Sequence, residues 1–116
     1  MYAAPLEFVG TISGKRILLC GVGEAAVALA RAGADVYGFD ASAAQVEAVN
    51  GLARDLGLRA QTHLQTLVAE HLPYPDSFFD LAFVLHDSEV ERRGKELARV
   101  LKRGGQTALM GYSKAW

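Results

Sequence analysis

The sequence contains one cysteine, Cys20, and only three prolines among its 116 residues. A single cysteine excludes an intramolecular disulfide framework and any zinc site built from several cysteines. No apolar run approaches the roughly 18 residues of a membrane span, and the first residues lack the basic flank of a signal peptide. Neither sign of charge dominates, since 12 Lys and Arg oppose 13 Asp and Glu, so nothing favours a purely electrostatic nucleic-acid binder. We expect a soluble, cytoplasmic protein that binds neither membranes nor nucleic acid.

The composition is that of a folded domain. Hydrophobic residues make up 51% of the chain and charged residues 22%, which excludes an intrinsically disordered segment. A chain of this length accommodates one hydrophobic core. We therefore expect a lead-in segment over residues 1–14, which contains Pro5 and two glycines, followed by a single domain over residues 15–116.

Short apolar runs alternate with helical patterns along the chain. The expected strands are 16–20, 36–39, 58–63, 81–85 and 107–110, and the expected helices are 24–32, 43–56 and one that begins near Ser88 and ends at Gly104–Gly105. Ser42 is a suitable N-cap for the second helix. Strands separated by helices form parallel β-α-β units. The pattern predicts an α/β fold with an open, doubly wound, mostly parallel five-stranded sheet.

Two features stand where ligands bind in such sheets, at the carboxyl ends of the strands. Gly21 and Gly23 follow the first strand, where glycine lets the backbone turn tightly and approach a ligand. Asp40 ends the second strand, where a carboxylate can accept hydrogen bonds from ribose hydroxyls. These residues predict an adenosine-type ligand, although glycines also serve ordinary turns. Dinucleotides and S-adenosylmethionine both remain open; Glu24 slightly favours the latter, because it would repel a pyrophosphate.

The second half of the chain narrows this choice. Residues 72–81 read LPYPDSFFDL and resemble the segment that leads into strand four of class I S-adenosylmethionine-dependent methyltransferases. Residues 96–105 read ELARVLKRGG and are similar to that family's helix and turn before strand five, with Arg103 in place of a proline. The resemblance spans about residues 15–112 and is closest to the type-11 group, which acts on small molecules. It implies a Rossmann-like fold, S-adenosylmethionine as cofactor and a small-molecule acceptor.

The resemblance also assigns cofactor contacts, position by position. Gly21 and Gly23 match the glycines that pass the methionine moiety. Asp40 matches the acid that holds the ribose, and Ala41 lies where the adenine edge would run. Leu85 matches the end of strand four, where cofactor and acceptor meet.

His86 is the candidate for a catalytic residue. Methyl transfer from a sulfonium needs mostly proximity and alignment, and a general base is needed only when the acceptor must lose a proton. His86 follows strand four and could serve as that base, with Asp87 as an orienting partner; the alternative is a loop histidine without a chemical role. His63 and His71 are interpreted as surface or packing residues.

Three departures from the family pattern concern the cofactor site. Leu19 stands where the family commonly has an acid within strand one, and Ala25 replaces the third glycine of the loop. The segment before strand four offers only Glu70, out of register, where the family often has an aspartate for the adenine amine. Losing two polar contacts of about 1 kcal/mol each would weaken cofactor binding roughly tenfold to thirtyfold.

Family members continue past strand five with another helix and two more strands. We therefore expect strand five to be a sheet edge with unpaired backbone groups, and apolar residues such as Leu109 and Met110 to be exposed. Such an edge favours a homo- or hetero-oligomer, for example a dimer, formed through strand five. Whether the chain is catalytic stays open. The alternatives are a non-catalytic subunit that binds the cofactor or a protein partner through this edge, and an NAD-binding Rossmann protein.

Half of the basic residues lie between Glu91 and Arg103. A nucleic-acid face is one interpretation of this run. A solvated helix face is the other, with Lys102 and Arg103 placed favourably at the helix C-terminus, and it is the one we expect.

Overall fold

The computed structural model describes residues 12–68, 70–84 and 87–109. Its strands are β1 (Arg16–Cys20), β2 (Asp35–Asp40), β3 (Thr62–Thr66), β4 (Phe79–Val84) and β5 (Leu101–Leu109), and its helices are α2 (Glu24–Arg31), α3 (Ala43–Asp55), the short 3₁₀ helix η1 (Arg59–Gln61) and α4 (Asp87–Val100). The five strands form one parallel sheet in the order β3-β2-β1-β4-β5. The predicted α/β architecture is confirmed.

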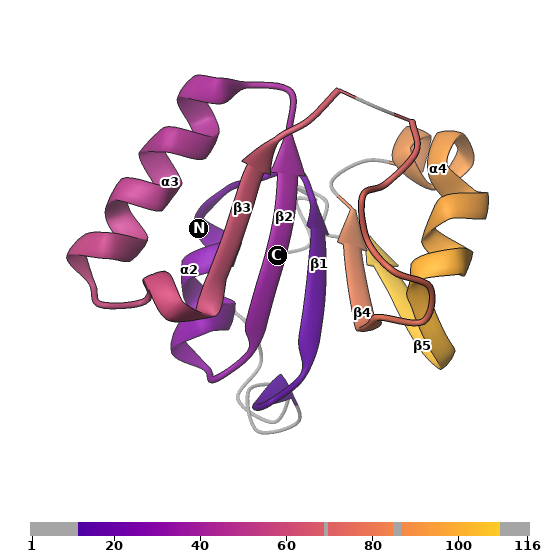
Figure 1. Cartoon of the computed structure of the whole chain (residues 1–116), viewed down its shortest axis with the longest axis horizontal. Helices are drawn as coiled ribbons and strands as arrows, with labels where there is room; N and C mark the ends of the chain where they lie inside the picture. The colour runs from indigo at the N-terminus through magenta and orange to yellow at the C-terminus, as the bar shows by residue number, and fades with distance from the viewer. Residues whose placement is uncertain (1–11, 69, 85–86, 110–116) are drawn as a thin grey trace.

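Helices cover both faces of this sheet. Residues of α2 and α3 pack with Ile17 and Leu19 on one face, while residues of α4 pack with Leu18 and Cys20 on the other (Figure 1). Strand β1 is central and buried on both sides, which explains why its sequence is a continuous apolar run. Cys20 is buried, as expected. Ile12, at the end of the lead-in segment, is fully buried in the same core as α2.

Local sequence signals explain where helices α2 and α3 begin and end. Gly33 has a φ of +96° just after α2, a conformation that glycine adopts without a steric penalty. Ser42 caps α3, since its hydroxyl accepts a hydrogen bond from the backbone N–H of Gln45 at 3.2 Å. Both helices lie within one residue of their expected bounds.

Strand β3 differs from the prediction. We expected it over residues 58–63, but it begins at Thr62, because residues 59–61 form the turn η1. The hydroxyl of Thr62 donates a hydrogen bond to the carbonyl of Leu58 at 3.2 Å, which stabilises this turn. The later start places Thr66 opposite Asp40 in the parallel register.

The end of α4 was also predicted incorrectly. The helix ends at Val100 rather than at the glycine pair, and Leu101 already pairs with Phe79 of β4. The glycines instead lie in an irregularity of β5, where Gly104 has a φ of +84°. A Cβ on Gly105 would stand 2.8 Å from a backbone oxygen. The glycine pair therefore serves a bulge in a strand, a role that its sequence does not distinguish from a helix end.

None of the helices in the described ranges is long and apolar enough to cross a membrane. Strand β5 pairs with β4 on one side and ends the sheet in the described part of the chain. Met110 and the side chain of Leu109 lie outside what the structure describes.

Candidate functional site

The parallel register of β1 and β2 brings the two predicted ligand-binding segments together. Cys20 pairs with Phe39, so the glycine loop that follows β1 lies beside the end of β2 at the top of the sheet in Figure 1. The backbone N–H of Gly21 donates to the carbonyl of Phe39 at 2.9 Å. The expected meeting of the loop and Asp40 is found.

The carboxylate of Asp40 faces this loop. One oxygen accepts a hydrogen bond from the backbone N–H of Val22, and the other accepts one from the N–H of Ser42, both at 2.9 Å. A carboxylate oxygen accepts about two hydrogen bonds, so within the described ranges each oxygen keeps capacity for another donor. A partly buried carboxylate fixed in this way is suited to bind a pair of neighbouring hydroxyls.

Gln45 completes the arrangement from helix α3. Its side-chain amide Nε2 donates to the carbonyl of Val22 at 2.9 Å, while its backbone N–H donates to the hydroxyl of Ser42. We refer to Val22, Asp40, Ser42 and Gln45 as the strand-tip network. Asp40 and the helix cap at Ser42 were predicted from the sequence, whereas the roles of Val22 and Gln45 were not.

The two glycines of the loop serve different purposes. Gly21 has a φ of +117°, a conformation that favours glycine. Gly23 is the N-cap of α2 with extended backbone, and a Cβ built on it would meet no described atom within 4 Å. The fold therefore requires glycine at position 21, whereas the open space over Gly23 is available to a ligand.

Ala41 is exposed directly after Asp40, at the position expected for an adenine edge. The segment after β3 reaches the same strand tip, since the N–H of Leu67 donates to the carbonyl of Asp40 at 3.0 Å. Val68, the next residue, is 78% exposed. The exposed residue that follows Leu67 is therefore apolar and offers no polar side chain to a ligand.

The departures at positions 19 and 25 have structural explanations. Leu19 is fully buried and Ala25 is 5% exposed, both in the core beneath α2 and α3. Neither position offers a polar group to a ligand. Leu85 and His86 lie outside the described residues, so their proposed contacts with cofactor and acceptor stay predictions.

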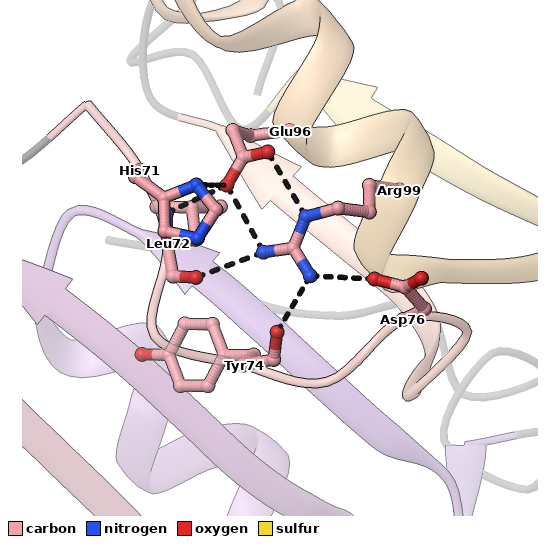
Figure 2. Close-up of polar contacts among 6 residues, drawn as sticks. All are labelled: His71, Leu72, Tyr74, Asp76, Glu96 and Arg99. Atoms are coloured by element: carbon pink, nitrogen blue, oxygen red, sulfur yellow. Dashed lines mark hydrogen bonds and ion pairs between the residues drawn. The ribbon is translucent and has the colours of Figure 1, made fainter.

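A second polar network joins α4 to the loop before β4, as Figure 2 shows. The Arg99 guanidinium donates to both carboxylate oxygens of Glu96, at 2.9 and 3.0 Å. It also donates to the carbonyls of Leu72 and Tyr74 and to the carboxylate of Asp76, at 2.8, 2.9 and 2.7 Å. These contacts use all five N–H donors of an arginine. We call these five residues the loop clamp.

The loop clamp also lowers the pKa of the Glu96 carboxyl group. The Arg99 guanidinium, helped by the backbone N–H of Leu72, lowers the pKa of Glu96 to about 2. Glu96 in turn raises the pKa of Arg99. His71 is exposed and its Nδ1 lies 3.0 Å from a Glu96 oxygen, consistent with the expected surface role.

The expectation of a solvated basic face on α4 was wrong for two residues. Arg93 is 5% exposed and its guanidinium lies 5.0 Å from the centre of the Phe39 ring. Arg99 is partly buried in the loop clamp. Lys102 lies in β5, not at a helix end, and pairs with Asp80 at 3.2 Å. The sequence showed how many basic residues there are, but not which of them reach carboxylates and rings from other elements.

An open cavity of about 500 Å³ lies elsewhere on the sheet, along β2 and β3. His63 stacks on Tyr37 there, with ring centres 4.3 Å apart, and pairs with Asp35 at 2.8 Å. The expected packing role of His63 is confirmed. Tyr74 and Phe78 contribute to the far wall of this cavity.

Several curated methyltransferases are similar in sequence to this chain. The chain is 37% identical over 95 residues to the methyltransferase GfsG of Streptomyces halstedii, covering 78% of this chain and 34% of that protein. It is 36% identical over 114 residues to the uncharacterized methyltransferase sll0829 of a Synechocystis strain, covering 91% and 51%. The chain thus spans about a third to a half of the length of these curated relatives.

Solved structures show the same fold. The [4+2]-cyclase SpnF superposes with a TM-score of 0.69 at 33% identity, over 83% of this chain and 40% of that one. A geranyl diphosphate methyltransferase in complex with SAM superposes with a TM-score of 0.77 at 22% identity, over 90% and 47%. A family model described as a methyltransferase domain matches residues 18–109. The chain therefore belongs to the class I S-adenosylmethionine-dependent methyltransferase family, as the sequence resemblance implied.

Proposed function

We propose that this chain binds S-adenosylmethionine at the strand-tip network and takes part in methyl transfer to a small-molecule acceptor. The observation that carries the proposal is the Asp40 carboxylate, which two backbone N–H groups hold at the sheet's carboxyl edge while each oxygen accepts one hydrogen bond from the residues that the structure describes. The cofactor of the family is S-adenosylmethionine, and its ribose offers two neighbouring hydroxyls.

The described residues fit this cofactor. Asp40 would accept the ribose hydroxyls, and Ala41 would border the adenine. The open space over Gly23 leaves room for the methionine moiety beside the turn at Gly21. Leu85, which follows β4 in the sequence and lies outside the described residues, is a further proposed contact of the cofactor. When bound, the cofactor supplies an activated methyl group.

The protein's own contribution to such a reaction is mainly positional. The residues at the strand tips would hold one reactant in a fixed orientation, and the loops above them would exclude water. His86 would accept the proton of an acceptor hydroxyl, amine or activated carbon during transfer, with Asp87 orienting its ring. An acceptor without a proton to lose would not need His86.

Relatives support a small-molecule acceptor. Among the proteins similar to this chain are ubiquinone/menaquinone biosynthesis C-methyltransferases, one of which, from Laribacter hongkongensis, is 46% identical over 52 residues. A tocopherol O-methyltransferase from rice, described as probable, is 34% identical over 98 residues. Both names denote small organic acceptors.

The structure favours keeping a second candidate function, that of a non-catalytic subunit. Strand β5 is the edge of the described sheet, and we propose that it pairs with a second chain, of the same or another kind. We further propose that the protein is cytoplasmic.

Calorimetric titration tests the cofactor proposal. We expect S-adenosylhomocysteine to bind at one site per chain and NAD not to bind, because Glu24 would repel a pyrophosphate at the start of α2. Binding of NAD in preference to S-adenosylhomocysteine would contradict the proposal. A turnover assay with small hydroxylated and quinone acceptors then separates a catalyst from a non-catalytic subunit, and light scattering detects pairing through β5.

A further inference from the structure

We propose that Gln45 is a positioning residue for the cofactor site: it holds the backbone of Val22 so that Val22 fixes the Asp40 carboxylate toward the ribose. The inference rests on the proposed function and goes further, because it assigns a role to a residue outside the glycine loop and the strand tip. Its basis is the strand-tip network, in which Gln45 never touches Asp40 directly but acts through Val22.

Val22 is held at three points. Its N–H donates to Asp40, its carbonyl accepts from the Gln45 side chain, and its own side chain is 3% exposed in the core. On either side stand Gly21 and Gly23, which give the backbone little intrinsic stiffness. The orientation of the Val22 N–H therefore depends on these contacts. The contact with Gln45, which comes from α3, can be removed by a substitution that alters neither Asp40 nor a core side chain.

The hydrogen bond from Gln45 to Val22 takes the place of the capping-box hydrogen bond that a residue at this position commonly makes. Ser42 and Gln45 have the spacing of a capping box, in which the residue three positions after the cap reaches back to the cap's backbone N–H. Here the Ser42 N–H is bound by Asp40 instead. The Gln45 side chain is thereby released from helix capping and donates across to Val22. One carboxylate thus organises both the helix start and the glycine loop.

The chemistry of the contact specifies an amide. The Val22 carbonyl needs a donor, which Gln45 supplies through Nε2. Glutamate has the same shape but no donor when ionised, and it would place a carboxylate against a carbonyl oxygen. Gln45 is an exposed residue in the first turn of α3, so Gln45→Glu removes the contact without opening a cavity in the core.

A double-mutant cycle tests this role, with S-adenosylhomocysteine as the probe. We expect Gln45→Glu to weaken binding by about tenfold, because the Asp40 carboxylate would no longer be aligned for its hydrogen bonds to the ribose. The melting temperature should shift by less than about 2 °C. The preference for adenosine over 2′,3′-dideoxyadenosine should shrink, because that preference reports the ribose contact. In the Asp40→Asn background, Gln45→Glu should have little further effect, since residues that act through one another are not additive.

Gln65→Glu is the matched control. Gln65 is also an exposed glutamine with a side-chain donor contact, to the Tyr74 hydroxyl at 3.3 Å. Tyr74 packs in the core cluster on the α4 side of the sheet, so this contact is separate from α3 and the strand-tip network. We expect the control to leave both affinity and ribose preference unchanged. Equal losses in the two variants would overturn the inference, as would additive losses with Asp40→Asn.

Amide hydrogen exchange of Val22 in the free protein keeps this test independent of ligand binding. Gln45→Glu should accelerate exchange at the Val22 N–H by about tenfold, and Gln65→Glu should not. If the unmodified protein fails to bind S-adenosylhomocysteine but the exchange result holds, the proposed function fails, while Gln45 is still shown to hold the Val22 backbone. If the protein binds the probe and exchange at Val22 is unchanged in Gln45→Glu, only the positioning role is refuted.

Discussion

The strand-tip network and the loop clamp are both built on a charged side chain surrounded by backbone groups, yet one is saturated and the other is not. In the loop clamp, all five donors of Arg99 have acceptors, two of which are carboxylates. In the strand-tip network, the hydrogen bonds that the Asp40 carboxylate accepts from described residues come from two backbone N–H groups. No described cationic side chain pairs with it. A saturated network can stabilise the fold, whereas an unsaturated one leaves acceptor capacity for a ligand.

The positions of the two networks support the same distinction. The loop clamp closes the segment before β4 onto α4, so its contacts join residues 23 to 27 positions apart. The strand-tip network lies where β1 and β2 end, beside the open space at Gly23. Substitutions should therefore separate stability from binding, with each effect confined to one network.

Asp40→Asn should have the largest effect on binding. The substitution removes the charge that the ribose hydroxyls would meet, so affinity for S-adenosylhomocysteine should fall about 100-fold. The melting temperature should change far less, because the amide oxygen of asparagine still accepts one of the two backbone N–H groups. Isothermal calorimetry and a thermal melt measure the two effects. An unchanged affinity for S-adenosylhomocysteine would show that Asp40 does not contact the ligand.

Gly23→Ala should come next, with roughly tenfold weaker binding. The new methyl group would enter the space assigned to the cofactor, while the free protein has room for it. Gly21→Ala is the contrasting variant: its φ of +117° should cost about 1–3 kcal/mol of folding free energy. Chemical denaturation of both variants shows this difference. If Gly23→Ala bound the probe normally, the space over Gly23 would not be the cofactor's.

Arg99→Met should lower the melting temperature by several degrees and leave cofactor affinity within about twofold. The substitution keeps an unbranched apolar stem but removes the guanidinium, which leaves the carbonyls of Leu72 and Tyr74 and the Glu96 carboxylate without their partner. Arg103→Met, which changes an exposed arginine of β5, is the control and should have little effect on either quantity. A large loss of affinity in Arg99→Met at full stability would break the proposed separation.

The smallest expected effect is a pH dependence. The pKa of Glu96 is lowered from 4.5 to about 2 in the folded chain, chiefly by Arg99. The stability it contributes is therefore present above about pH 4.5 and is lost as pH falls toward 2. The difference in melting temperature between the unmodified protein and Glu96→Gln should be constant near neutral pH and shrink over this window. A difference that did not change with pH would show that the charge of Glu96 contributes nothing.

The sequence predicted the placement of the site better than its internal contacts. The meeting of Gly21 and Asp40 follows from the β-α-β pattern alone, because neighbouring parallel strands end at the same edge. Ser42 as a cap and Cys20 as a core residue were likewise local signals. Gln45 was missed because its partner lies 23 residues away: the Ser42 N–H donates to Asp40, and the Gln45 side chain donates to the carbonyl of Val22.

Other errors share one cause, a competition between local and distant partners. The glycine pair at 104–105 has the form of a helix end, but pairing of Leu101 with Phe79 starts a strand earlier. Arg93 and Arg99 belong to a basic, polar run, yet Phe39 and the segment 72–76 approach them from elsewhere in the chain. Such contacts depend on how the elements pack, which composition and periodicity do not encode.

Mapping the amide resonances during titration with S-adenosylhomocysteine tests the central claim most directly. The largest shifts should occur at Val22, Gly23 and Ser42, the backbone groups around the Asp40 carboxylate. The amides of Leu72 and Asp76 in the loop clamp should barely move. Shifts concentrated instead along the cavity at Tyr37 and His63, with the strand tips unaffected, would show that the ligand binds elsewhere and would contradict the account.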